Sequence, residues 1–266
     1  MLTLLKPHGS LLGRGLLLAL LLAPFAVRAQ MSTDLIMETY NSNISVITNG
    51  IINKSMMDKA VERNNAGRNA GRAAATPRTS ASASASATAS ATASASTAYT
   101  STPALRRQTV QNCIDRLKTS NPTGAQAIAT TFGPGKYDYG QVFQGLVRDS
   151  GLRENDAADN LASYLILGWM IVNNVQDGNA VTVPMARGAR AQVAPLLAAN
   201  AQARTRAAQV GEELKLQAVV VQGGWQAAVK GGSLAAYQES IGNLFKTQYG
   251  MDMRQFKLTS QGFVKK

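Results

Sequence analysis

The chain has 266 residues, a formal net charge of +12, one histidine and one cysteine. This length allows one or two domains. Because Cys113 has no second cysteine to pair with, an intrachain disulfide is excluded, and a folded domain must be stabilised by a packed core. We expect Cys113 to be a small buried residue rather than a reactive thiol.

The first residues have the pattern of a secretory signal peptide, which we assign to residues 1–29. Lys6 and Arg14 precede an apolar run over residues 16–27. Small residues then lead to a cleavage point after Ala29. An uncleaved membrane anchor is the alternative. Cleavage would leave no transmembrane helix, would lower the net charge from +12 to +9 by removing three basic residues, and would place the mature protein in the periplasm or outside the cell.

The cleaved peptide also contains the only histidine, His8. A mature chain that starts after Ala29 therefore has no imidazole. This excludes Ser-His-Asp and Cys-His catalysis and histidine-based metal sites. We predict no catalytic residue, no metal site and no cofactor.

Two segments separate the signal peptide from the main domain. Residues 30–72 carry apolar residues spaced by three or four, which predicts a short N-terminal segment that is partly helical or disordered. Residues 73–102 are almost wholly Ala, Ser and Thr. Such side chains bury too little area to offset the entropy of ordering the backbone, so we predict a flexible linker, with a silk-like β-stack as the alternative.

Residues 103–264 are predicted to form an all-α domain, a compact bundle of about six helices around one buried helix, with a short extended C-terminal tail. The apolar spacing predicts helices over 104–118, 140–150, 155–174, from 184 onward with a kink or break at 195, 204–221, and 233–249. Gly223-Gly224 is expected to end the fifth helix and Gly250 the sixth.

The stretch 155–174 organises this domain. Asp156 and Asp159 can cap a helix start, and residues 161–172 are apolar around nearly the whole circumference. A helix that is apolar on all sides is buried, and this run is too short to span a bilayer.

The order of short motifs resembles an uncharacterised bacterial family of exported helical proteins known only as a domain of unknown function. The similarity lies in the 132–135 turn (Phe-Gly-Pro-Gly), the 155–158 helix start (Asn-Asp-x-Ala), and the C-terminal Phe256 to Thr259 followed by Gly262 and Phe263. It covers residues 103–264. The resemblance implies a helical domain and supplies no catalytic residues.

Carboxylates are the groups from which a histidine-free hydrolase would be built, since a pair of them can cleave a glycosidic bond. The candidates are Asp156, Asp159, Glu212, Glu213 and Glu239. Helix capping explains the two aspartates equally well, and Glu212-Glu213 is expected to form a solvent-facing turn of its helix. A carboxylate-dependent hydrolase of cell-wall glycans is therefore the alternative function rather than the first.

The first hypothesis is a non-catalytic binding or structural role at the cell envelope. No acid lies between Asp177 and Glu212, and this stretch contains four arginines that could bind an anionic envelope polymer or another envelope protein: Arg187, Arg190, Arg204 and Arg206. A solvated basic face is the alternative. Aromatic residues that nucleic-acid binders place among such cations are missing there, so nucleic acid is not favoured.

A second candidate site is the loop after residue 131. Phe132, Tyr137 and Tyr139 could line a pocket, although a plain turn supported by a buried Phe132 is the simpler interpretation. The sequence carries no signal for an oligomeric state.

Overall fold

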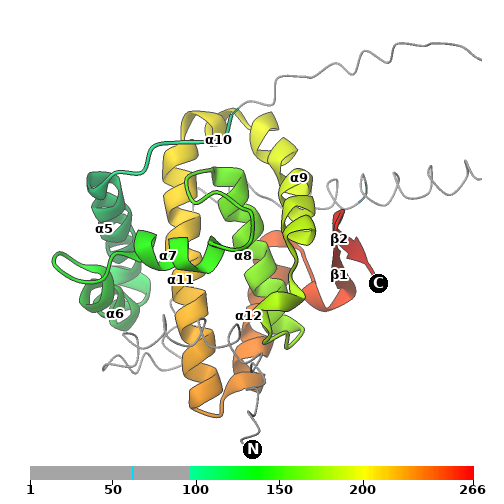
Figure 1. Cartoon of the computed structure of the whole chain (residues 1–266). Coiled ribbons are helices and arrows are strands. Elements are labelled where there is room, and N and C mark those ends of the chain that lie inside the picture. The colour runs from blue at the N-terminus through cyan, green and yellow to red at the C-terminus, as the bar shows by residue number, and fades with distance from the viewer. Residues whose placement is uncertain (1–61, 63–95) are drawn as a thin grey trace, which may run out of the picture. The chain divides into compact units, whose positions relative to one another are not determined.

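The computed structural model describes Glu62 and residues 96–266. Residues 96–266 form a helical bundle with a short C-terminal hairpin, which confirms the predicted all-α class (Figure 1). The helices are α5 (Pro103–Ser120), α6 (Pro122–Phe132), α7 (Tyr139–Val147), α8 (Ala157–Val172), α9 (Val183–Ala199), α10 (Ala201–Thr205), α11 (Ala207–Lys230) and α12 (Leu234–Tyr249). Two 3₁₀ turns, η2 (Gly178–Ala180) and η3 (Met253–Gln255), precede α9 and the hairpin. The predicted signal peptide, N-terminal segment and most of the linker lie outside the described residues.

The buried helix is α8, and it starts where the sequence predicted. The Asp156 side chain accepts hydrogen bonds from the backbone N–H groups of Ala158 and Asp159, at 3.0 and 3.1 Å, which confirms the cap. Leu161 and Leu165 are fully buried. In the described part of the chain, α8 packs against α9, α11 and α12, and no helix there is both long and apolar enough to cross a bilayer.

The longest helix of residues 96–266, α11, has 24 residues and lies beside α8 through the middle of the bundle (Figure 1). It continues through Gly223 and Gly224, so the predicted end at these glycines was wrong. Each helical glycine costs about 1 kcal/mol relative to alanine. The buried side chains of Trp225 and Ala228 continue the apolar face beyond the glycines, and this packing compensates for that cost.

Two short helices were not predicted. The dipeptide Asn121-Pro122 follows the last residue of α5 and also begins α6: the Asn121 side chain accepts from the Gly124 N–H at 2.8 Å, and Pro122 occupies the first helical position. Likewise, α9 stays helical through Pro195, and Asn200 then caps α10 by accepting from the Ala203 N–H at 3.0 Å. Asparagine thus serves here as the N-cap that starts both helices.

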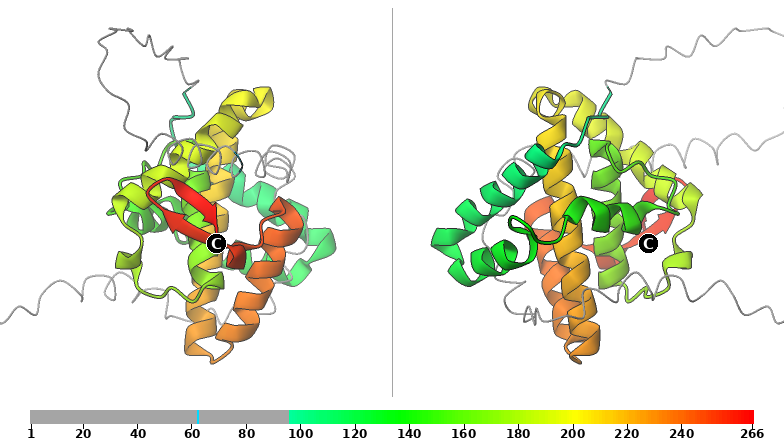
Figure 2. Two further views of the ribbon diagram at one scale, coloured as in Figure 1. Left: turned by 90° about the vertical axis from the view of Figure 1, so that its right-hand side faces the viewer. Right: turned by 60° about the vertical axis from the view of Figure 1, so that its left-hand side comes forward.

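The tail forms two antiparallel strands, β1 (Phe256–Thr259) and β2 (Gly262–Lys265). Figure 2 shows this hairpin lying on α9. The Gln192 side chain fixes its position, because its Nε2 donates to the Phe263 carbonyl at 3.0 Å and its Oε1 accepts from the Phe263 N–H at 2.8 Å. A Cβ atom at Gly188 would lie 2.3 Å from the Ser260 carbonyl oxygen, so only glycine permits this approach.

Candidate functional site

Four of the candidate carboxylates are inside the protein. Asp156 and Asp159 are each 1% exposed at the start of α8, and Glu212 and Glu213 are 0% and 5% exposed on α11. The prediction that Glu212 and Glu213 form a solvent-facing turn was therefore wrong. A buried carboxylate is tolerated only where cations or hydrogen-bond donors surround it, and each of these four has such partners.

The two aspartates share two arginines. Arg153 donates from Nη2 to Asp156 at 2.6 Å and from Nε to Asp159 at 2.8 Å. Arg190 of α9 approaches from another side, with its Nε 2.8 Å from Asp159 Oδ1. Of the predicted anion-binding arginines, Arg190 is thus already occupied by carboxylates of its own chain. The hydrogen bond to Asp159 raises the pKa of Arg153.

Glu212 accepts three hydrogen bonds. The phenol of Tyr139 donates to it at 2.6 Å, the phenol of Tyr99 at 3.0 Å and the ammonium of Lys215 at 2.8 Å. Burial, followed by the charge of Glu212, raises the pKa of both tyrosines, so both phenols stay protonated donors. Glu213 is paired separately with Arg116 at 3.2 Å.

Lys215 is also buried, with 2% of its side chain exposed. Its Nζ donates to Asn155 Oδ1 at 2.7 Å and lies 5.2 Å from the centre of the Tyr99 ring. Asn160 completes the group by donating from Nδ2 to the Tyr99 hydroxyl at 3.0 Å and to the Gly211 carbonyl at 3.2 Å. We call these six residues the Glu212 cluster: Tyr99, Tyr139, Asn155, Asn160, Glu212 and Lys215.

The segment 96–102, which we call the strap, brings Tyr99 into this cluster. The Ala157 N–H donates to the Thr97 carbonyl at 2.9 Å, and the Tyr99 N–H donates to the Asn155 carbonyl at 3.0 Å. The Thr97 hydroxyl donates to Asp156 Oδ1 at 2.7 Å. The strap was assigned to the C-terminal end of the linker, but its contacts make it part of the helical domain, which therefore begins before Pro103.

Gly211 explains how the Tyr99 ring fits. A Cβ atom at this position would lie 2.3 Å from Tyr99 Cε1, so the missing side chain leaves the space that the ring fills. Sequence reasoning missed both Tyr99 and Lys215. A lone tyrosine at the end of an Ala/Ser/Thr tract and a lysine inside an apolar helix were the signals that could have identified them.

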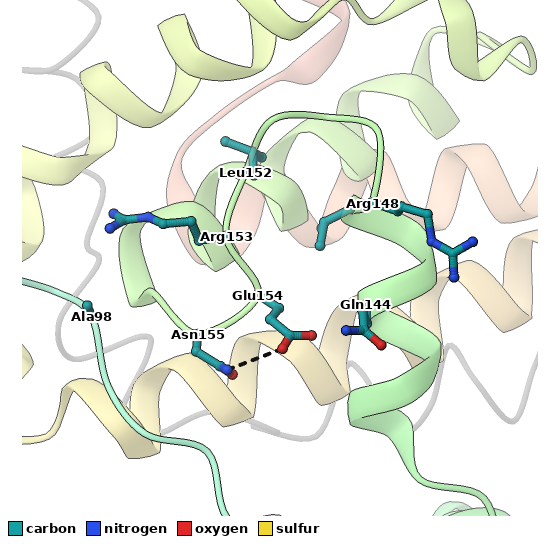
Figure 3. Close-up of a pocket in the computed structure, with 8 residues that line it drawn as sticks. Ala98, Gln144, Arg148, Leu152, Arg153, Glu154 and Asn155 are labelled. Carbon is teal, nitrogen blue, oxygen red and sulfur yellow. Dashed lines mark hydrogen bonds between the residues drawn. The ribbon is translucent and has the colours of Figure 1, made fainter.

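An open pocket of about 560 Å³ lies next to the strap. Its lining residues are Ala98, Gln144, Val147, Arg148, Leu152, Arg153, Glu154 and Asn155. In Figure 3 the side chains of Gln144, Glu154 and Asn155 lie near one another, while the guanidinium groups of Arg148 and Arg153 extend to opposite sides. Asn155 belongs both to this pocket and to the Glu212 cluster, so it connects the surface with the buried lysine.

The structure separates the four predicted arginines into two pairs. Arg187 is exposed on α9. It lies close to Gly151 in the loop before the pocket residue Leu152, since a Cβ atom at Gly151 would lie 3.4 Å from Arg187 Nε. Arg190 is one helical turn further along. Arg204, in α10, and Arg206, between α10 and α11, are exposed beyond the C-terminal end of α9, and Arg204 Nη1 donates to the Ala198 carbonyl at 2.6 Å.

The predicted aromatic residues do not line the pocket described above. Phe132 and Tyr139 are buried against each other, edge to face, with ring centroids 6.4 Å apart. Tyr137 is 45% exposed in the loop between them. Within residues 96–266, no group of three side chains of the types that usually bind metals comes together.

The fold and the site define a helical domain with a buried polar cluster and an open pocket flanked by arginines. The chain belongs to a family of unknown function, DUF6683, whose model matches residues 12–266. This confirms the resemblance to a domain of unknown function, and the match extends well beyond residues 103–264 on the N-terminal side. No curated protein and no solved structure matched the chain.

Proposed function

We propose that this protein is an exported, non-catalytic module that binds an anionic polymer of the cell envelope beside the 148–155 loop. Export is inferred from the signal-peptide pattern of residues 1–29, and the excess of Lys and Arg over Asp and Glu, 27 against 15, supports an anionic partner. The observation that carries the proposal is the exposed Arg148 in the lining of the pocket, together with the exposed Arg187 of α9 beside Gly151 of the same loop.

The buried carboxylates favour binding over glycan hydrolysis. A glycosidase needs two carboxyl groups that face the sugar from opposite sides of one open cleft. Asp156, Asp159, Glu212 and Glu213 are buried and paired with arginine or lysine, and Glu212 also accepts hydrogen bonds from phenols. Glu154 is the one carboxylate among the residues that line the pocket.

The polar groups of the pocket suit a ligand that carries both charge and hydrogen-bonding groups. Arg148 is exposed, and its guanidinium can bind a carboxylate or a phosphate through two parallel hydrogen bonds. Gln144 offers an amide next to it, and Val147 and Leu152 supply an apolar floor. This combination fits an acidic polysaccharide or a polymer of phosphate esters better than a neutral chain.

The test measures binding of the purified protein to immobilised polygalacturonate and dextran sulfate, with neutral dextran as the reference, at increasing salt. We expect retention on the two polyanions that falls steeply with ionic strength. The double variant Arg148→Ala, Arg187→Ala should weaken retention about tenfold, because each exposed contact contributes on the order of 0.5–1 kcal/mol. The charge-matched control is Lys230→Ala, Lys246→Ala, which removes two exposed cations at the far end of α11 and on α12. An equal loss of retention in both double variants would show that only the net charge matters, and it would contradict a binding site at the pocket.

A further inference from the structure

Lys215, Asn155 and Glu212 form a group whose chemistry goes beyond ligand binding. The lysine amine, an amide carbonyl and a carboxylic acid meet in one buried place, where Nζ is 2.7 Å from Asn155 Oδ1 and 2.8 Å from Glu212 Oε1. We infer that Lys215 and Asn155 form an intramolecular isopeptide bond, in which the Lys215 amine joins the Asn155 side chain and Glu212 accepts the first proton from that amine.

The geometry places the nucleophile next to its target. An ammonium group can only donate hydrogen bonds, so the Asn155 atom that it contacts must be the carbonyl oxygen. Cγ is bonded to that oxygen, so the carbon that Nζ would attack is the next atom beyond the 2.7 Å contact. Holding two reactants in this way replaces a slow bimolecular encounter by an intramolecular step, which is worth many orders of magnitude in rate.

The reaction needs a neutral amine, and Glu212 is placed to take the proton that must leave. Lys215 is 2% and Glu212 0% exposed, and the Tyr99 ring lies over the amine. Proton transfer from Nζ to Glu212 Oε1, along the existing hydrogen bond of 2.8 Å, produces the neutral amine.

The bond changes balance without an oxidant or a cofactor. The Nζ lone pair forms a bond to Asn155 Cγ, and the carbonyl electron pair moves to Oδ1. A second proton from Nζ passes to Asn155 Nδ2, the Cγ–Nδ2 bond breaks, and the carbonyl forms again. One ammonia leaves, Glu212 keeps the first proton, and a secondary amide links the two side chains.

The pocket supplies the exit for ammonia. Asn155 is half-buried and lines the open pocket, and its Nδ2 lies 3.3 Å from Glu154 Oε1 on the solvent side (Figure 3). The amide therefore faces the lysine with its oxygen and the pocket with its leaving group. The resulting link would connect α11 with the turn before α8, two segments 60 residues apart. In a chain with a single cysteine, this bond would provide a covalent cross-link that a disulfide cannot provide.

The test is a tryptic peptide map of the purified full chain. Cleavage at Arg153, Arg187, Arg206 and Lys230 isolates residues 154–187 and 207–230. We expect a branched product of these two segments, lighter than their sum by one ammonia, with Lys215 resistant to trypsin. The wild-type map is decisive by itself, so it does not depend on whether a variant folds.

Variants then assign the roles. Lys215→Met and Glu212→Gln should abolish the branched product, whereas Lys246→Met, an exposed lysine on α12, should leave it unchanged. Separate peptides with trypsin cleavage after Lys215 would overturn the inference. Loss of ammonia from Asn155 with normal cleavage at Lys215 would also overturn it, because that result indicates a succinimide. A branched product in Glu212→Gln would overturn the role of the acid.

Discussion

Gly168 of α8 faces the ring of Phe245 on α12 so closely that an added methyl group has no space. A Cβ atom there would lie 2.2 Å from Phe245 Cε2 and 2.4 Å from Cζ. The ring is fully buried, and its centroid is 5.1 Å from that of Tyr164 and 5.5 Å from that of Tyr249. Because its neighbours hold it on both sides, the ring cannot move aside without disturbing the packing between α8 and α12. We therefore predict that Gly168→Ala destabilises the protein.

The magnitude follows from two opposing terms. Overpacking a core position costs about 1–3 kcal/mol, and replacing a helical glycine by alanine returns about 1 kcal/mol. The close contact at Gly168 puts the first term near its upper end, so the net loss should be about 1–2 kcal/mol. Gly223 of α11 provides the matched control, because a Cβ atom there meets nothing within 4 Å. Gly223→Ala should therefore gain about 0.5–1 kcal/mol.

Urea unfolding of the full chain, followed by far-ultraviolet circular dichroism, measures both changes. With a slope of about 2 kcal/mol per molar urea, Gly168→Ala should lower the midpoint by about 0.5–1 M and Gly223→Ala should raise it by about 0.3–0.5 M. If Gly168→Ala were as stable as Gly223→Ala, the contact between α8 and Phe245 described above would be incorrect.

Two further predictions concern the strap and the cysteine. Tyr99→Ala should lower the free energy of unfolding by about 3–5 kcal/mol, because it empties the space above Gly211 and removes one hydrogen-bond donor from Glu212. Thermal unfolding measures this loss, with Tyr137→Ala in the exposed loop as the control. Equal losses in the two variants would contradict a structural role for the strap. Burial raises the pKa of Cys113 from its ordinary value near 9 to about 11. A raised pKa in the folded state adds stability that is complete below pH 9 and is lost as the pH rises toward 11, by about 1.4 kcal/mol per pH unit. The difference in unfolding free energy between the wild type and Cys113→Ala should shrink over that range, and a constant difference would show that the thiol is accessible to solvent.

Some helix starts and ends that depend on neighbouring residues were predicted correctly from the sequence. The apolar run of α8, its Asp156 cap and the left-handed Gly250 that ends α12, with φ of 67°, were all predicted from neighbouring residues. The extension of α11 beyond Gly224 was missed because it depends on burial of Trp225 and Ala228 by other parts of the bundle. Helix propensity correctly describes the cost of the two glycines, and tertiary packing outweighs it.

The Glu212 cluster was also missed because it depends on contacts between residues that are far apart in the sequence. Glu212 is buried because Tyr99 and Tyr139 reach it from positions 113 and 73 residues away. Neither tyrosine has a spacing relative to Glu212 that a helix or strand pattern would show. The predicted aromatic loop did include Tyr139, but its role is to donate a hydrogen bond inside the domain rather than to line the pocket.

The strap also determines where mechanical load enters the domain. Any tension applied to the N-terminal part of the chain arrives first at Thr97 and Tyr99, which are hydrogen-bonded to the start of α8 and to Glu212 near the start of α11. The force is therefore distributed over the two central helices instead of peeling α5 away from its end. An anchor of this kind suits a domain that has to stay folded while the rest of its chain is pulled.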